Sequence, residues 1–249
     1  MTTHIDLALI GGTGLYRFPG LEDVERHAVD TPYGHPSDAV VLGKVGTHRI
    51  AFLARHGESH AIPPHRVNYR ANLWALHHLG ARRVLGVNAV GGIRADMGPR
   101  VLAVPDQIID YTSDRLTSYC DVAGAEVRHI DFSEPYSAGL RNDLLGAARR
   151  AGVALVDGGC YGATQGPRLE TRAEIARLRR DGCDLVGMTG MPEAALAREL
   201  ELDYACLALV ANWAAGCGDE AEISLPEIFA NLEAATAEVP RIVTALLAS

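Results

Sequence analysis

The chain lacks the features that define several classes of protein. None of its apolar runs approaches the roughly 18–20 residues of a membrane-spanning helix. Its basic residues are scattered, with no run longer than two, and its formal net charge is −8, which argues against nucleic acid as the main partner. The start, MTTHIDLALIGG, lacks the basic and apolar regions of a secretory signal, and the five cysteines form no C-x-x-C pair. We therefore expect a cytoplasmic protein with reduced thiols.

The glycine-rich segment GGTGLYR, residues 11–17, does not match the common nucleotide-binding motifs. It is not G-x-G-x-x-G, because Arg17 occupies the last position, and it is not a P-loop, because the terminal G-K-[ST] is missing. An enzyme that depends on nicotinamide or ATP is therefore disfavoured. We expect no cofactor.

Apolar runs that end in glycine turns alternate with amphipathic segments that carry helix caps, such as Thr171 followed three residues later by Glu174. This alternation predicts one α/β domain over residues 1–249, with a mixed, mostly parallel central sheet flanked by helices. Two adjacent strands are expected to form a hairpin at Gly46-Thr47. The predicted strands are 6–10, 38–45, 48–54, 81–92, 101–112, 153–162, 183–188 and 202–212, and the predicted helices are 65–80, 137–152, 171–182, 190–201 and 225–249.

Polar and glycine-rich segments follow the predicted strands, and open α/β sheets bind ligands at such strand ends. Thr13, Arg55, His56 and Thr189 lie in these segments and could converge on one oxyanion. Glycine turns expose backbone N–H groups, while threonine hydroxyls and arginine donate further hydrogen bonds. The alternative for the GGTG segment is a simple tight turn.

The segment RHGES, residues 55–59, allows two other interpretations. It resembles the phosphohistidine motif of the phosphoglycerate mutase and acid phosphatase superfamily, in which His56 would be the nucleophile. That superfamily carries the motif on its first strand and needs a second histidine late in the chain, whereas the last histidine here is His129. His56 and His60 could also suggest zinc, but Gly57 disfavours a helix and no third ligand stands at a familiar spacing. We expect no metal site.

Taken together, the segments resemble the trimeric nucleoside phosphorylases, a family that includes methylthioadenosine phosphorylase and purine nucleoside phosphorylase. The matching segments run in family order over nearly the whole chain, so that the set is far more specific than any one of them. They are IGGTGLY, DTPYGHPSDAVVLGKV, ARHGESHAIPPHRVNYRANLWAL, NAVGGI, HIDFSEPY, GPRLETRAEI and DLVGMTGMPEAALARELEL.

The resemblance implies that inorganic phosphate, as co-substrate, attacks the anomeric carbon of a purine nucleoside and displaces the base. It assigns phosphate binding to Thr13, Arg55, His56, Thr189 and the backbone near Ala89. A fixed arginine and hydroxyl groups can neutralise and orient phosphate without a metal.

The resemblance also places three further residues at the substrate. Met188 lies against the ribose, and Leu169 belongs to the substrate pocket. The resemblance implies that His129 is donated across a subunit interface of a homotrimer, whereas a lone histidine beside a strand is more often structural than functional.

The identity of the base depends on Asn212, the one polar residue in the apolar run ALVANWAAG. In the resemblance, adenine-cleaving members carry a carboxylate there and another two residues later, whereas this chain has Asn212 and Ala214. Glu170 likewise matches the 6-oxopurine-specific relatives. An amide can donate to the 6-oxygen, and a carboxylate can accept the proton on the 1-nitrogen, so we expect a 6-oxopurine. The alternative for both residues is a structural role.

The segment after the last strand covers the 5′ end of the sugar in this family. It contains Ile223, Leu225, Ile228 and Phe229 and no histidine. Leu225 and Phe229 share a helix face, as they would also do in a packed core. An apolar lid favours a methylthio group over a hydroxyl, so that the expected substrate is S-methyl-5′-thioinosine. Methylthioadenosine, inosine or guanosine as substrate, and a binding protein built on the same fold, are the alternatives.

Overall fold

A computed structural model describes residues 4–122, 124–218 and 224–248 of the 249-residue chain. All the strands in this part belong to one mixed sheet with the order β2-β3-β4-β1-β5-β10-β9-β7, to which β11 adds by pairing with β5 and β6, and β8 by pairing with β6. The strands are β1 (Leu7–Gly11), β2 (Glu22–His27), β3 (Val40–Val45), β4 (His48–Ala54), β5 (Arg83–Gly92), β6 (Leu102–Val104), β7 (Gln107–Asp110), β8 (Val156–Asp157), β9 (Cys160–Ala163), β10 (Leu185–Gly187) and β11 (Asp203–Trp213).

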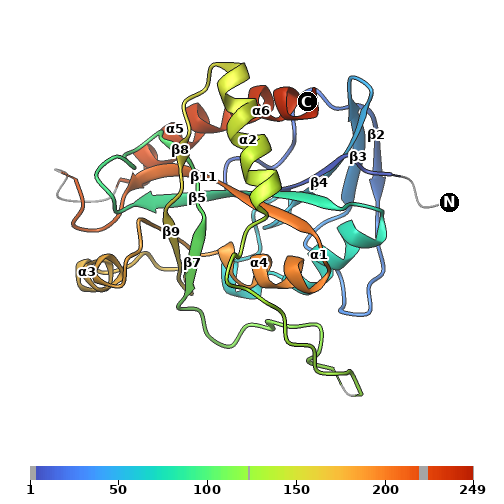
Figure 1. The fold of residues 1–249 in the computed structure, drawn as a ribbon, viewed down its shortest axis with the longest axis horizontal. Coiled ribbons are helices and arrows are strands. Elements are labelled where there is room, and N and C mark those ends of the chain that lie inside the picture. The colour runs from blue at the N-terminus through green and yellow to red at the C-terminus, as the bar shows by residue number, and fades with distance from the viewer. Residues whose placement is uncertain (1–3, 123, 219–223, 249) are drawn as a thin grey trace.

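The helices cover both faces of the sheet, which gives three layers (Figure 1). The helices α2, α5 and α6 pack on one face and α1 and α4 on the other, while α3 lies at one edge. They are α1 (Tyr69–His78), α2 (Ala138–Ala151), α3 (Arg172–Arg180), α4 (Gly190–Glu199), α5 (Leu225–Thr236) and α6 (Val239–Leu247), with a 3₁₀ turn at Pro64–Arg66 before α1. The mixed, mostly parallel sheet with flanking helices is therefore confirmed. That residues 1–249 form one domain stays a prediction, and the single sheet is consistent with it.

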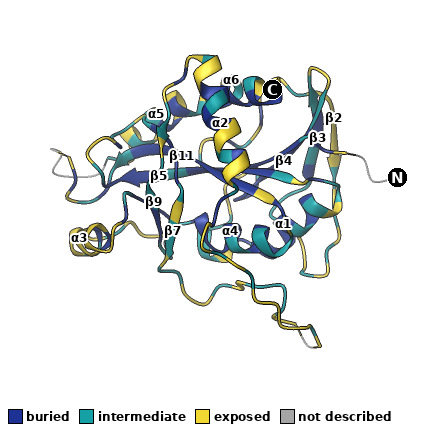
Figure 2. Cartoon of the chain, viewed as in Figure 1, coloured by how far each residue is buried: buried dark blue, intermediate teal, exposed yellow. Residues whose placement is uncertain are grey.

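The buried residues form one apolar layer on each side of the sheet (Figure 2). Along β1, the side chains of Leu7 and Leu9 join one layer, while Ala8 and Ile10 join the other. This alternation follows from the two-residue repeat of a strand. A strand covered on both faces is largely apolar, which explains why Asn88 and Asn212 are the only polar residues in the interiors of β5 and β11.

Local sequence signals account for several element boundaries. Ser137 caps α2, and Gly152 ends that helix in the left-handed conformation with φ 66°. The predicted capping box of α3 is present, since the Thr171 side chain accepts from the Glu174 backbone and the Glu174 side chain accepts from the Thr171 backbone. The predicted hairpin forms between β3 and β4, with Gly46 at φ 60° in the turn.

Other boundaries differ from the prediction. The predicted strand at 101–112 is divided at Pro105 into β6, which pairs with β11, and β7, which pairs with β9. The predicted strand at 153–162 is divided at Gly158 and Gly159, both with positive φ. The closing helix is two helices, with Pro240 in the first turn of α6, and β2 was not predicted. At the two divided strands the halves pair with different partners, while Pro240 begins a new helix at the division of the closing helix.

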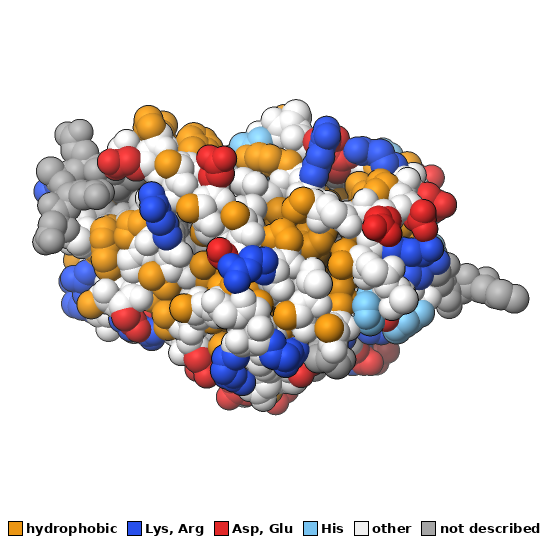
Figure 3. Space-filling view, turned by 90° about the horizontal axis from the view of Figure 1, so that it is seen from above, with side chains coloured by type: hydrophobic (Ala, Val, Ile, Leu, Met, Phe, Trp, Pro, Cys, Tyr) orange, Lys and Arg blue, Asp and Glu red, His pale blue; other side chains and the backbone are white. Residues whose placement is uncertain are grey.

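The sheet topology gathers the carboxyl ends of the central parallel strands. Strand β5 lies between β1 and β11 and is parallel to both. The β5–β11 register shifts between Val210 and Asn212, and such an irregularity redirects the side chain next to it. Figure 3 shows a face on which basic, acidic and hydrophobic side chains are interspersed rather than gathered into one basic patch. In the described part of the chain, no helix is long and apolar enough to cross a membrane.

Candidate active site

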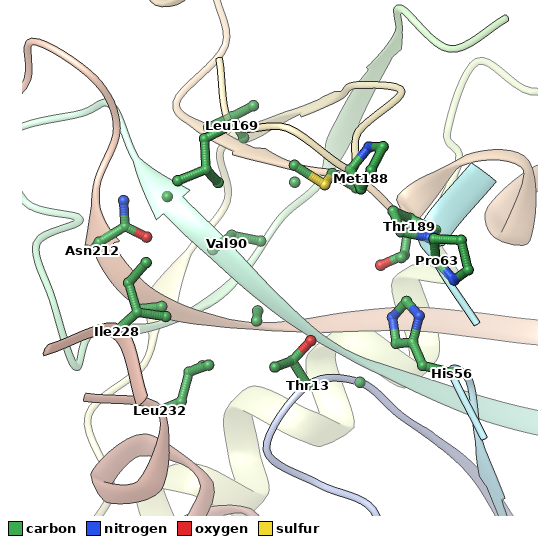
Figure 4. Close-up of a pocket in the computed structure, with 18 of the residues that line it drawn as sticks. Thr13, His56, Pro63, Val90, Leu169, Met188, Thr189, Asn212, Ile228 and Leu232 are labelled. Carbon is green, nitrogen blue, oxygen red and sulfur yellow. The ribbon is translucent and has the colours of Figure 1, made fainter. Parts of the chain in front are cut away.

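A cavity of about 570 Å³ opens where these strands end (Figure 4). Most of the residues predicted for the site line it, and they come from segments spread over the whole chain. These residues are Thr13, Arg55, His56, Ala89, Leu169, Glu170, Met188, Thr189, Asn212 and Ala214. The fold therefore brings together the polar strand-end segments, as expected for an α/β sheet.

At one end of the cavity, Thr13 is presented by the glycine turn that follows β1. A Cβ atom on Gly12 would lie 2.6 Å from the carbonyl oxygen of Val87 and 2.9 Å from Nη1 of Arg55. Only glycine therefore allows the turn to approach β5 and Arg55 so closely. Thr13 and His56 face the cavity from adjacent loops, with Thr189 opposite them (Figure 4).

Arg55 lies at the base of this end with no solvent exposure. Its Nε and Nη2 atoms donate to the two carboxylate oxygens of Glu193 at 2.7 and 2.8 Å, and Nη1 donates to the Val87 carbonyl at 2.9 Å. Burial works against the charge of Arg55, but Glu193 beside it raises the pKa of Arg55 above its usual value. Since Nη2 also donates to Asn88, one N–H of Nη1 is left for a ligand.

Asn88 connects the arginine to the threonine across the site. Its side-chain oxygen accepts from Arg55, and its Nδ2 donates to Oγ1 of Thr189 at 2.9 Å. Because Oγ1 of Thr189 accepts this bond, its own proton is free to donate into the cavity. Asn88 is fully buried, so this orientation of the hydroxyl is maintained by the core rather than by solvent.

The imidazole of His56 is held in one tautomer. Its Nδ1 lies 2.8 Å from the carbonyl oxygen of Ile62, so Nδ1 carries the proton and donates it. Burial, and then the charge of Arg55, lower the pKa of His56 to about 4. The ring is therefore neutral near neutral pH and presents Nε2 as an acceptor.

At the other end of the cavity Asn212 presents an amide (Figure 4), and Glu170, next to Leu169 in the chain, adds a carboxylate to the lining. Asn212 points into the cavity near Leu169 (Figure 4). Its Nδ2 donates to the Trp213 carbonyl at 2.6 Å, and this is the only hydrogen bond of that side chain among the described residues. The second N–H and the amide oxygen are therefore available to a ligand. Glu170 accepts a bond of 2.6 Å from the Thr164 hydroxyl.

The thioether of Met188 lies between the two ends (Figure 4). A Cβ on Gly166 would stand 2.4 Å from its Sδ atom, so the loop can pass over Met188 only with glycine at that position. Arg115 supports the same region from behind, because it donates to the carbonyl oxygens of Met188 and Gln165 at 2.8 Å each. A polarizable sulfur is thus fixed in the middle of the cavity.

The apolar wall of the cavity corrects the prediction for Leu225 and Phe229. Their exposed fractions are 62% and 57%, and neither lines the cavity. Ile228 and Leu232, on the neighbouring face of α5, line it instead. The face of α5 that contains Leu232 and Ala235 packs on the core, and Leu225 and Phe229 therefore face solvent. Ile223 lies outside the described residues.

His129 does not reach the cavity of its own chain. It is exposed on the long excursion between β7 and α2, where it lines a separate hollow with Tyr136 and Arg198. The prediction that a neighbouring subunit receives His129 stays a prediction.

Several residues of the site were not predicted. His60 lines the cavity with φ 54°, and its ring contacts Tyr16 and His56 at centroid distances of 5.5 and 4.9 Å. Glu193 and Asn88 are each the lone polar side chain in an apolar segment, the same signal that drew attention to Asn212. No cluster of three or more His, Cys, Asp or Glu side chains in the described part of the chain could hold a metal ion.

Known proteins resemble this chain over nearly its whole length. Residues 6–248 match the model of the phosphorylase superfamily. The chain is 62% identical over 242 residues to the probable S-methyl-5′-thioinosine phosphorylase of Xanthomonas campestris pv. campestris, covering 97% of each chain. It is 61% identical over 228 residues to a protein of the same name in Xylella fastidiosa, covering 92% of this chain and 96% of that relative.

A solved structure of another phosphorylase resembles the fold of this chain. The methylthioadenosine phosphorylase of Schistosoma mansoni in complex with adenine matches with a TM-score of 0.93 at 31% identity, covering 98% of this chain and 91% of that one. The chain therefore belongs to the phosphorylase superfamily, and it is an enzyme. This family replaces the phosphohistidine interpretation of RHGES.

Proposed function

We propose that the protein uses inorganic phosphate to cleave the N-glycosidic bond of S-methyl-5′-thioinosine. The products are hypoxanthine and 5-methylthioribose 1-phosphate. The observation that carries the proposal is that Asn212 and Glu170 line the same cavity as Thr13, His56 and Thr189. The relatives at 62% and 61% identity, whose names specify this substrate, support it.

The base end is complementary to a 6-oxopurine. The free N–H of Asn212 can donate to the 6-oxygen, and its oxygen can accept a proton from the 7-nitrogen as the base leaves. Glu170, oriented by Thr164, can accept the proton on the 1-nitrogen. Adenine presents the opposite pattern, with a donor amino group and a lone pair on its 1-nitrogen. Each buried mismatch costs about 1–3 kcal/mol, which favours hypoxanthine.

The sugar end supports a methylthio group. Ile228 and Leu232 present an apolar wall, and the described part of α5 adds no polar side chain to the cavity. A buried 5′-hydroxyl without a partner there would lose its hydrogen bonds to water. Met188, beside the ribose, suits the positive charge that develops on the sugar as the bond breaks.

The anion end supplies phosphate as co-substrate and needs no other cofactor. The hydroxyls of Thr13 and Thr189, the remaining N–H of Arg55 and the backbone near Ala89 can orient the anion beneath the sugar. Arg55→Ala would remove a contact to the transition state as well as the partner of the buried Glu193. We expect it to abolish most activity.

The working enzyme is proposed to be a homotrimer in which a neighbour's His129 completes each site. Support comes from the apolar side chains exposed on the excursion that carries His129, namely Leu116, Val122 and Val127. A contact with a neighbouring subunit would bury these apolar side chains. A fully active monomer in sedimentation would contradict this proposal. The cytoplasmic location also stays a prediction.

The test of function is a panel of five nucleosides with and without phosphate. Methylthioinosine, methylthioadenosine, inosine, guanosine and adenosine are compared by kcat/KM. We expect strict dependence on phosphate, activity that persists with a chelator, and preference for methylthioinosine. Preference for methylthioadenosine or inosine would reassign the base or the sugar. Absence of base release in every reaction would favour a binding protein.

A further inference from the structure

The anion end contains one acceptor among its donors. Nδ1 of His56 gives its proton to the Ile62 carbonyl at 2.8 Å, so the other ring nitrogen, Nε2, carries only a lone pair. Among the described residues Nε2 has no hydrogen-bond partner. The ring lines the cavity, where Figure 4 shows it facing Thr13 and Thr189.

The surroundings of His56 disfavour a second proton on the ring. Arg55 precedes it in the chain, and the His60 ring lies 4.9 Å away. The nearby carboxylate, Glu193, is bound to Arg55 and to the Tyr204 hydroxyl rather than to His56. Burial and the Arg55 charge accordingly hold the pKa of His56 at about 4. No carboxylate in the described part of the chain forms an ion pair with His56.

The charge of the anion end is balanced before any anion arrives. Arg55 and Glu193 are both fully buried and their formal charges cancel. An entering anion therefore meets hydroxyls, N–H groups and the Nε2 lone pair, rather than a free positive charge. An oxyanion with no proton would place its own lone pair against Nε2, whereas a protonated oxygen would donate to it.

We propose that His56 makes this site selective for a tetrahedral oxyanion that brings its own proton, with the protonated oxygen donating to Nε2. The proposal rests on phosphate as the co-substrate. Hydrogen phosphate and hydrogen arsenate belong to the accepted class, and sulfate and monofluorophosphate do not. Because the oxygen bound to His56 is protonated, the nucleophile is one of the other oxygens. His56 thereby sets the orientation of the anion as well as its identity.

The first test measures binding of the four anions to the wild-type protein at pH 7.5, by calorimetry, without nucleoside. We expect arsenate to bind within about threefold of phosphate. Sulfate and monofluorophosphate should bind about tenfold or more weakly, because each leaves two acceptors facing each other. Sulfate stays a dianion from pH 7.5 to 5.5, and its affinity should rise as the pH is lowered, by at most about tenfold per pH unit, as His56 takes up the missing proton. Equal affinity for sulfate and phosphate, without a pH slope, would overturn the proposal.

Two variants separate His56 from its surroundings. His56→Gln supplies an amide that can donate as well as accept, so the difference between phosphate and sulfate should fall below about threefold. His60→Gln changes the neighbouring ring, which has no bond to Ile62, and should keep the difference. If His60→Gln loses the difference in affinity between phosphate and sulfate while His56→Gln keeps it, the selectivity belongs to His60 and the proposal is wrong.

A spectroscopic measurement avoids dependence on variants that fail to fold. In protein labelled with ¹⁵N-histidine, Nε2 of His56 should remain unprotonated in the phosphate complex at pH 7.5, with the proton on Nδ1. An imidazolium in that complex would refute the proposal. This measurement does not depend on turnover. If the protein binds phosphate in this way but cleaves no methylthio nucleoside, only the proposed function is refuted. Absence of phosphate binding would refute both.

Discussion

Replacing Asn212 with aspartate tests the base end most directly. In the structure the Asn212 amide donates to the Trp213 carbonyl at 2.6 Å and leaves one N–H and one oxygen for the base. Asn212→Asp keeps the shape but removes both N–H groups. The carboxylate would then oppose the Trp213 carbonyl on one side and the 6-oxygen of the substrate on the other, acceptor against acceptor.

The size of the effect follows from these two contacts. A buried donor or acceptor without a partner costs about 1–3 kcal/mol, and more when it is charged. The Trp213 contact exists with or without substrate, so its loss should appear mainly as reduced stability. The substrate contact should lower kcat/KM for methylthioinosine about a hundredfold, or near 3 kcal/mol. A protonated aspartate restores a donor, so part of the activity should return as the pH is lowered toward 5.

The assay is phosphorolysis of methylthioinosine and methylthioadenosine by wild type, Asn212→Asp and a triple variant that adds Glu170→Ser and Ala214→Asp. The triple variant should shift preference toward methylthioadenosine, because all three changes match the adenine edge. Asn231→Asp is the matched control, since the Asn231 side chain donates to the Ala211 carbonyl at 2.9 Å and is not among the residues that line the cavity. Its kcat/KM should stay within about threefold of wild type. If Asn212→Asp leaves methylthioinosine cleavage untouched, Asn212 is a structural amide and the assignment of the base is wrong.

Three further predictions concern the rest of the cavity. Glu193→Gln leaves the buried Arg55 without its counter-charge and should lower the free energy of unfolding by about 3–5 kcal/mol; an unchanged denaturant midpoint would show that the pair has no such role. Ile228→Ala should lower kcat/KM about tenfold for methylthioinosine but less for inosine, which lacks the methylthio group; equal losses would place the 5′ end elsewhere. Between pH 6.5 and 4 the unfolded chain binds a proton at His56 that the native state does not. The free energy of unfolding should therefore decrease by up to about 3 kcal/mol as the pH is lowered from 6.5 to 4. In urea unfolding, His56→Gln should remove this part of the pH dependence.

The chain order of strands, glycine turns and capped helices was predictable because its signals are local. The capping box at Thr171 and Glu174 depends on residues three apart, and the turn at Gly46 on a single positive φ. Such features depend on short-range geometry, which the sequence states directly. Asn212 was also identifiable, since a polar side chain in an apolar run needs a partner wherever it is buried. Glu170, in the polar segment GPRLETRAEI, was identified only through the family resemblance.

Tertiary structure alone decided which helix face meets the cavity and which buried charges meet each other. Leu225 and Phe229 have the same four-residue spacing as Ile228 and Leu232, so periodicity identifies both faces but cannot choose between them. The choice follows from the packing of Leu232 and Ala235 against the sheet. Arg55 and Glu193 are 138 residues apart, and no local pattern joins them. Their pairing, and with it the neutral His56, arises because the fold brings the end of β4 against α4, where only a bonded carboxylate allows a buried guanidinium to stay.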